Sequence, residues 1–398
     1  MKPLAVLLLI AMLLPLAGCW DRVELDRLAI VLLLGIDTDP LGDGFEVTVH
    51  VLNVAAGPGG QGGTSGGGGE GGSSRNISQT LTLSARGQTI NDATRNLRGR
   101  VQGRFSFHHV RIVLIGEDLA RKGIKPVLDL LFRAPEIRLT SYIVVCQGSA
   151  RDKMLLAPEI TGTLDEELRG LIEMQGEWSK GYTPRLLEFC TNYADKGIQP
   201  VAGKLIKLTY RTPLQPDSSE QQTKTAILEG LAVFCDDQLR GWLSATETIG
   251  FRYIIGKGGT MALAVPWHGA KISIELSPET CCLDYIAGST RPRFRVSLSA
   301  SGQILEYTGE IEFTPPLLAE LESLAADMLG DLLLKTVEKA REMDTDFLGY
   351  GAVIQRQAPR QWQSLNKEWR KTLHAVETDI EVKFSLINTG VTRSPLTR

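Results

Sequence analysis

The chain has 398 residues, of which 43% are hydrophobic and 22% are charged, a balance that indicates a folded protein with two or three domains. Its net charge of −3 and its lack of a basic cluster give no electrostatic reason to expect a nucleic acid partner. Its six cysteines form no Cys-x-x-Cys pair, so neither a zinc site nor a thioredoxin-like site is indicated.

The first eighteen residues have the pattern of an export signal. Lys2 precedes an apolar run from Leu4 to Leu14, which is shorter than the about 20 residues needed to span a bilayer. The run leads to Leu16-Ala17-Gly18-Cys19, which resembles the bacterial lipobox. We therefore predict cleavage of the signal peptide 1–18 and a diacylglycerol and N-acyl lipid on Cys19, with a plain secretory signal or an uncleaved anchor as the alternatives.

Residues 19–214 predict an α+β domain. A short helix over 21–28 leads into strands at 29–37 and 45–54, which the turn Asp43-Gly44 joins as a hairpin. Residues 57–74 are mostly glycine and predict a flexible surface loop. Further strands are expected at 77–84, 109–116 and 142–146, and helices at 87–101, 124–132, 164–177 and 184–194. This order favours an α+β fold over a doubly wound sheet.

The rest of the chain predicts two further domains. The polar stretch 215–222 is expected to be a linker before a β-rich middle domain at 223–278, with strands at 227–235, 239–243, 260–265 and 271–276. The turn Asp236-Asp237-Gln238 is expected to join the first two of these strands as a hairpin. In a C-terminal α+β domain at 279–398 we expect a hairpin at Ser301-Gly302, a long helix at 315–343 and a final strand at 380–387. The predicted fold class is thus α+β and multi-domain, with mixed or antiparallel sheets and packed helices.

Few residues suggest chemistry. His108 and His109 fall at the start of a predicted strand, where neighbouring side chains point to opposite faces, so we interpret them as packed or hydrogen-bonded rather than as metal ligands. Residues 250–258 lack the spacing of a phosphate loop and the Ser or Thr that should follow Lys257. Cys281 and Cys282 could form a vicinal disulfide or pair elsewhere. We predict no catalytic residue, no cofactor other than the lipid on Cys19, and no metal site.

Five groups of motifs along the chain together resemble one family, the Ger(x)C spore-germination lipoproteins, which are the C subunits of nutrient germinant receptors. The groups are Gly18-Cys19-Trp20-Asp21 with Gly35-Ile36-Asp37; Gly87-Gln88-Thr89-Ile90 with His108-His109; 130–138; 229–234 with Gly241-Trp242-Leu243; and Asp346-Phe347-Leu348-Gly349-Tyr350-Gly351 with Trp362, Trp369 and Asn388-Thr389-Gly390. The resemblance implies a three-domain α+β protein at the outer face of the spore's inner membrane. It also implies two integral-membrane partners, an A-type subunit and a transporter-like B-type subunit, and it supplies no catalytic residue.

The leading hypothesis is therefore a non-enzymatic, lipid-anchored subunit that supports assembly or signalling of a germinant receptor. The alternative is an extracytoplasmic solute-binding lipoprotein, which would normally show repeated βαβ units in two lobes. A lipid-anchored hydrolase is the third hypothesis, although no nucleophile–base pair can be read from the sequence. Trp362 and Trp369 either leave an apolar contact surface exposed or belong to the core.

Overall fold

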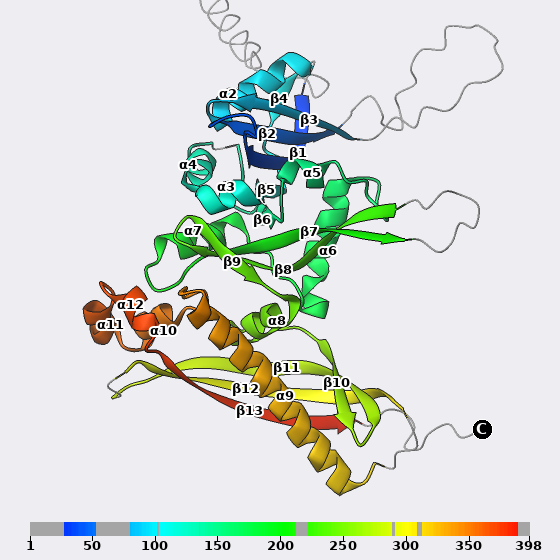
Figure 1. The fold of residues 1–398 in the computed structure, drawn as a ribbon, viewed down its shortest axis with the longest axis vertical. Coiled ribbons are helices and arrows are strands. Elements are labelled where there is room, and N and C mark those ends of the chain that lie inside the picture. The colour runs from blue at the N-terminus through cyan, green and yellow to red at the C-terminus, as the bar shows by residue number, and fades with distance from the viewer. Residues whose placement is uncertain are drawn as a thin grey trace, which may run out of the picture.

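A computed structural model of the chain describes residues 28–52, 80–101, 103–134, 136–211, 222–288, 291–308 and 313–388. Several predicted features lie outside the described residues: the signal peptide 1–18, Cys19, the Gly-rich tract 57–74 and nearly all of the helix at 21–28. The elements are stacked along the long axis of the molecule, with a large sheet toward one end and a small sheet at the other (Figure 1).

The large sheet has nine strands and a parallel centre. Its neighbours in order are β3 (Thr80–Gly87), β2 (Phe45–Leu52), β1 (Leu28–Thr38), β5 (Ile112–Gly116), β6 (Tyr142–Cys146), β7 (Val201–Arg211), β8 (Gln222–Cys235) and β9 (Gln238–Leu243), and the short β4 (Arg104–Ser106) pairs with β1. β1, β5, β6 and β7 run parallel, and β4 also pairs parallel with β1, whereas β2, β3, β8 and β9 pair antiparallel. The central strands are continuous apolar runs because both of their faces are buried.

Helices cover both faces of this sheet. One core contains α2 (Ile90–Leu97), α3 (Glu117–Lys122), α4 (Lys125–Arg133) and α7 (Leu186–Ala194), and the other contains α5 (Ala150–Met154) and α6 (Leu164–Trp178). Successive side chains of β5 alternate between the two cores: Val113 and Ile115 join the first, and Ile112 and Leu114 join the second. The large sheet is therefore the middle layer of three.

The small sheet has the order β10 (Met261–Trp267), β11 (Ala270–Ile286), β12 (Arg293–Tyr307) and β13 (Glu377–Asn388). Only the β12–β13 pair is parallel. The 28-residue helix α9 (Pro315–Glu342) lies across one face of the sheet and buries a stripe that includes Leu321, Ala325 and Leu329 (Figure 1). α10 (Tyr350–Gln357), α11 (Pro359–Leu365) and α12 (Trp369–Leu373) follow. The predicted α+β class and the predicted long helix are confirmed.

The predicted middle domain at 223–278 does not form a sheet of its own in this structure. Its first two strands, β8 and β9, extend the large sheet, whereas β10 and β11 belong to the small sheet. The helix α8 (Ala245–Ile254), which the sequence patterns did not predict, lies between the two pairs. The four predicted strands are divided between the two sheets because the apolar strand β8 pairs antiparallel along β7 and so completes the core of the large sheet.

Two predicted hairpins are confirmed and a third is wrong. Turns join β1 to β2 through Asp43-Gly44 and β8 to β9 through Asp236-Asp237. At Ser301-Gly302, however, the chain continues as the single strand β12. Gly302 marks a close approach rather than a turn, because an added Cβ would lie 2.8 Å from Cζ of Phe384 and 2.9 Å from Cγ2 of Ile274.

Candidate functional site

The residues that the sequence singled out do not converge on one site. Cys19 lies outside the described residues. His108 and His109 are exposed in a turn before β5, so the expected packing and the expected place at a strand start are wrong: Val110 is the buried residue there and the strand begins only at Ile112. Among the described residues, no group of three or more His, Cys, Asp or Glu side chains could hold a metal ion.

The neighbouring cysteines of β11 are both free in this structure. Cys281 is half-buried against the core of the small sheet, and burial raises the pKa of its thiol to about 12. Cys282 is exposed, because successive side chains of a strand point to opposite faces. Of the alternatives left open by the sequence, the structure therefore has neither a vicinal disulfide nor a pairing with another described cysteine.

Trp362 and Trp369 are core residues, with exposed fractions of 7% and 4%. Their rings meet edge to face with centroids 5.5 Å apart. Nε1 of Trp369 donates a hydrogen bond of 2.9 Å to Oδ2 of Asp346. The two tryptophans therefore leave no apolar contact surface, and they lead to a buried acid to which the sequence analysis gave no role.

Asp346 is the centre of a buried polar junction. Its carboxylate accepts hydrogen bonds from the backbone N–H groups of Gly349, Tyr350 and Gly351 at the start of α10. Burial raises the pKa of Asp346 to about 6, although these hydrogen bonds favour the charged form. The backbone oxygen of Asp346 also accepts from N–H of Gln199, beside the large sheet. The motif 346–351, which the sequence analysis singled out, thus links the C-terminal helices to the large sheet.

A second buried acid ends β1. Asp37 accepts hydrogen bonds from the backbone N–H groups of Ala150 and Arg151 and from Oγ of Ser149, so it caps the N-terminus of α5. Burial raises the pKa of this carboxyl group. Arg151 in turn pairs with Glu46 at 3.0 Å. The motif Gly35-Ile36-Asp37 therefore also stabilises the fold, by joining the end of β1 to the start of α5.

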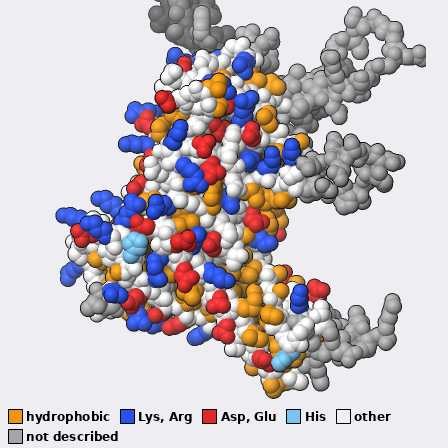
Figure 2. All heavy atoms as spheres, viewed as in Figure 1, with side chains coloured by type: hydrophobic (Ala, Val, Ile, Leu, Met, Phe, Trp, Pro, Cys, Tyr) orange, Lys and Arg blue, Asp and Glu red, His pale blue; other side chains and the backbone are white. Residues whose placement is uncertain are grey.

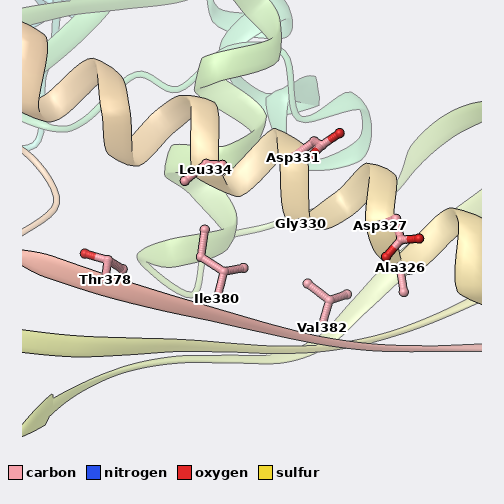
Figure 3. Close-up of a pocket in the computed structure, with 8 residues that line it drawn as sticks. All are labelled: Ala326, Asp327, Gly330, Asp331, Leu334, Thr378, Ile380 and Val382. Carbon is pink, nitrogen blue, oxygen red and sulfur yellow. The ribbon is translucent and has the colours of Figure 1, made fainter.

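The candidate binding site is a groove between α9 and β13, with a volume of about 440 Å³. We call it the α9–β13 groove; Figure 3 shows the eight residues that line it, Ala326, Asp327, Gly330, Asp331, Leu334, Thr378, Ile380 and Val382. Ile380 and Val382 point from the strand toward the helix, and Ala326 points from the helix toward the strand (Figure 3). The two aspartates are the only charged residues of the lining, and both are exposed.

Two family models match the chain in order. The Spore germination protein N-terminal domain matches residues 21–207, and the Spore germination B3/GerAC like, C-terminal model matches residues 229–390. The chain belongs to the GerAC family of spore germination proteins. The resemblance read from the sequence is confirmed, and family membership indicates a role in spore germination.

Relatives and a solved structure agree with this membership. The chain is 26% identical to Spore germination protein KC of Bacillus subtilis (strain 168), over 99% of this chain and 97% of the relative. It is 23% identical to Spore germination protein B3 of the same organism, over 95% and 96% of the two chains. The crystal structure of the GerBC protein is similar in fold, with a TM-score of 0.54 and 18% identity over 89% of this chain and 97% of that chain. None of the helices among the described residues is long and apolar enough to cross a membrane.

Proposed function

We propose that the chain is a non-enzymatic, lipid-anchored subunit of a nutrient germinant receptor at the outer face of the spore's inner membrane. The observation that carries the proposal is the match of both family models, in order, behind the lipobox-like sequence that ends at Cys19. In this role it supports assembly or signalling of two integral-membrane partners, an A-type subunit and a transporter-like B-type subunit. Two acyl chains are enough to hold a protein stably on a membrane.

The arrangement of the elements supports an orientation on the membrane. Cys19 lies nine positions before Leu28, where β1 begins, and nine residues span at most about 30 Å. A lipid on Cys19 would therefore keep the end of the molecule with β1, β2 and α2 near the bilayer. The small sheet lies at the opposite end of the long axis (Figure 1) and would face partner segments outside the membrane.

The substitution Cys19→Ala tests the anchor. We expect it to abolish lipid labelling and to move the chain from the membrane fraction to the soluble fraction, because it removes the thiol that takes the lipid. Germination with the cognate nutrient should fall, since the partners lose a tethered subunit. The matched control is Cys282→Ala, which removes an exposed free thiol and should leave labelling and fractionation unchanged. Lipid label on the Cys19→Ala chain would contradict the proposal.

The receptor role is tested by deleting the gene. We expect spores without the chain to lose germination with a particular nutrient while other nutrients still act. Normal germination of the deletion strain with every nutrient would refute this role. Tight binding of a small nutrient by the purified chain, together with normal germination, would instead favour a solute-binding lipoprotein.

A further inference from the structure

In the part of the chain that the structure describes, β13 is an edge strand whose outer backbone is largely unpaired. Within the described residues it pairs only with β12, through eleven of its twelve residues. N–H of Glu377 donates to the oxygen of Pro292 on the β12 side, so odd-numbered residues turn their backbone toward β12. By the same alternation Thr378, Ile380, Val382 and Phe384 turn theirs toward the open edge. An open row of this kind is a template for another strand.

α9 covers the far end of this edge but not its middle. The N–H of Leu386, also on the open side, donates to Oε1 of Glu322 at 2.8 Å, so a helix side chain already caps that position. Further along, the small residues Ala326 and Gly330 leave the α9–β13 groove between helix and strand. Ile380 and Val382 are consequently only partly buried. Apolar side chains lie exposed among charged ones along the course of α9 (Figure 2).

Two aspartates at the groove have no ion-pair partner among the described residues. Asp327 and Asp331 are exposed and lie one helical turn apart, where like charges destabilise a helix. Among the described residues, no Lys or Arg lies within ion-pair distance of either one. The acids on the opposite face of β13 differ in this respect, because Asp379 pairs with Arg293 and Glu381 pairs with Arg295. The groove therefore combines an apolar floor with two carboxylates that form no ion pair among the described residues, although Lys335 follows Asp331 by one helical turn.

We propose that the open edge of β13 and the α9–β13 groove together bind an extended segment of a partner protein. The segment adds a strand to β13 through its backbone, places apolar side chains against Ile380 and Val382, and directs a lysine or arginine toward Asp327 and Asp331. Strand addition derives affinity from the backbone and specificity from alternate side chains. A basic side chain fits because its aliphatic stem packs on apolar surface while its charge reaches the acids.

A second copy of this chain is a poorer occupant. Pairing β13 with β13 about a twofold axis would bring Asp327 and Asp331 of both copies to one seam, where their like charges repel. The complementary partner is therefore a segment that carries positive charge. That this partner is a receptor subunit rests on the proposed function, whereas the binding mode does not.

The binding mode can be measured with the full chain in detergent micelles and a fluorescently labelled synthetic peptide, Val-Thr-Lys-Thr-Val-Thr-Lys-Thr-Val. Its valines and lysines share the face that would meet α9. We expect saturable binding by fluorescence anisotropy. A peptide with the lysines replaced by glutamate should bind at least about tenfold more weakly, because attraction becomes repulsion. A peptide that is N-methylated at alternate residues should also lose binding, because it cannot pair with the edge.

Charge reversal on the protein tests whether the two aspartates determine the preference for lysine. The double variant Asp327→Lys/Asp331→Lys should invert the preference, so that the glutamate peptide binds more tightly than the lysine peptide. The matched control is Glu320→Lys/Glu338→Lys, which makes the same change in net charge on exposed positions of α9 outside the groove. The control should keep the preference for lysine.

Three results would overturn the proposal: no binding of the lysine peptide, an unchanged preference in the groove variant, or equal binding of the N-methylated peptide. Concentration-dependent self-association that the neutral variant Asp327→Asn/Asp331→Asn strengthens would assign the edge to a second copy instead. None of these outcomes depends on the lipid or on germination, so failure here is distinguishable from failure of the receptor role.

Discussion

Asp346 accepts four hydrogen bonds, from the backbone of Gly349, Tyr350 and Gly351 and from the indole of Trp369. One fully buried carboxylate therefore fixes the start of α10 and the position of α12. The sequence contained one signal for this role, an acid followed by glycine three and five positions later. Nothing in the local pattern showed that a tryptophan twenty-three positions away would donate the fourth hydrogen bond.

We predict that Asp346→Asn lowers the free energy of unfolding by about 3 kcal/mol, because an amide nitrogen cannot accept the hydrogen bonds that Oδ2 accepts from Gly351 and Trp369. Denaturant unfolding at neutral pH measures this. The matched control, Asp379→Asn, makes the same chemical change at an exposed ion pair and should alter stability little. Equal effects of the two substitutions would contradict the assignment.

The pH dependence of the same variant gives a second readout. The pKa of Asp346 rises from 3.8 to about 6 on burial, so the folded chain keeps a proton that the unfolded chain has already lost between these values. The contribution of this group to stability is therefore present at low pH and is lost as the pH rises from about 4 to about 6. The Asp346→Asn chain should lack this decline, and an unchanged pH profile between pH 4 and 7 would show that Asp346 does not titrate as described.

The crossing of α8 and α9 depends on a glycine inside a helix. Gly250 lies within α8, where glycine costs about 1 kcal/mol relative to alanine. An added Cβ would lie 2.1 Å from Oγ1 of Thr336 and 3.1 Å from Cδ2 of Leu332, both on α9. The glycine therefore permits close helix packing, which accounts for a residue that superficially resembled part of a phosphate loop.

We predict that Gly250→Ala lowers the free energy of unfolding by about 1–3 kcal/mol, despite the better helix propensity of alanine. In the double variant with Thr336→Ala part of the loss should be recovered, because the nearest clashing atom is removed. A double-mutant cycle by chemical denaturation measures this coupling. The control is Gly170→Ala in α6, where an added Cβ meets nothing within 4 Å and should raise stability by up to about 1 kcal/mol. Strictly additive effects of the first pair would refute the clash.

Local patterns predicted the elements whose signals are local. Alternation and the Asp43-Gly44 turn predicted the hairpin of β1 and β2, and one apolar stripe predicted α9. α8 was missed because residues 248–254 are all buried, so the helix has no polar face and no stripe to detect. The α9–β13 groove was beyond prediction as well, because it forms between residues about fifty positions apart.

At the scale of the molecule, the two sheets share a core. Leu231, Val233 and Leu243 of the large sheet pack in one hydrophobic cluster with Phe251 of α8 and Leu329 of α9. The first family model ends at residue 207, in β7, and the second begins at residue 229, in β8. Because β7 and β8 pair with each other, the gap between the two models falls within one sheet. The sequence did not show to which sheet β8 belongs, because an apolar strand of this kind could equally well pair with the strands that follow it in a separate middle domain.

This shared sheet predicts how the chain tolerates truncation. A Cys19→Ala chain that starts at residue 19 and ends after Arg211 loses Ala232, Phe234 and Leu239, which belong to the core of the large sheet. It also leaves the long edge of β7 unpaired, which favours aggregation. We expect oligomers in size-exclusion chromatography and no cooperative thermal transition. The matched chain that ends after Leu243 keeps all nine strands and should show a cooperative transition, although it exposes Leu231, Val233 and Leu243 and so should self-associate to some extent. A monomeric, cooperatively folding chain that ends after Arg211 would show that β8 and β9 are not needed to complete the large sheet.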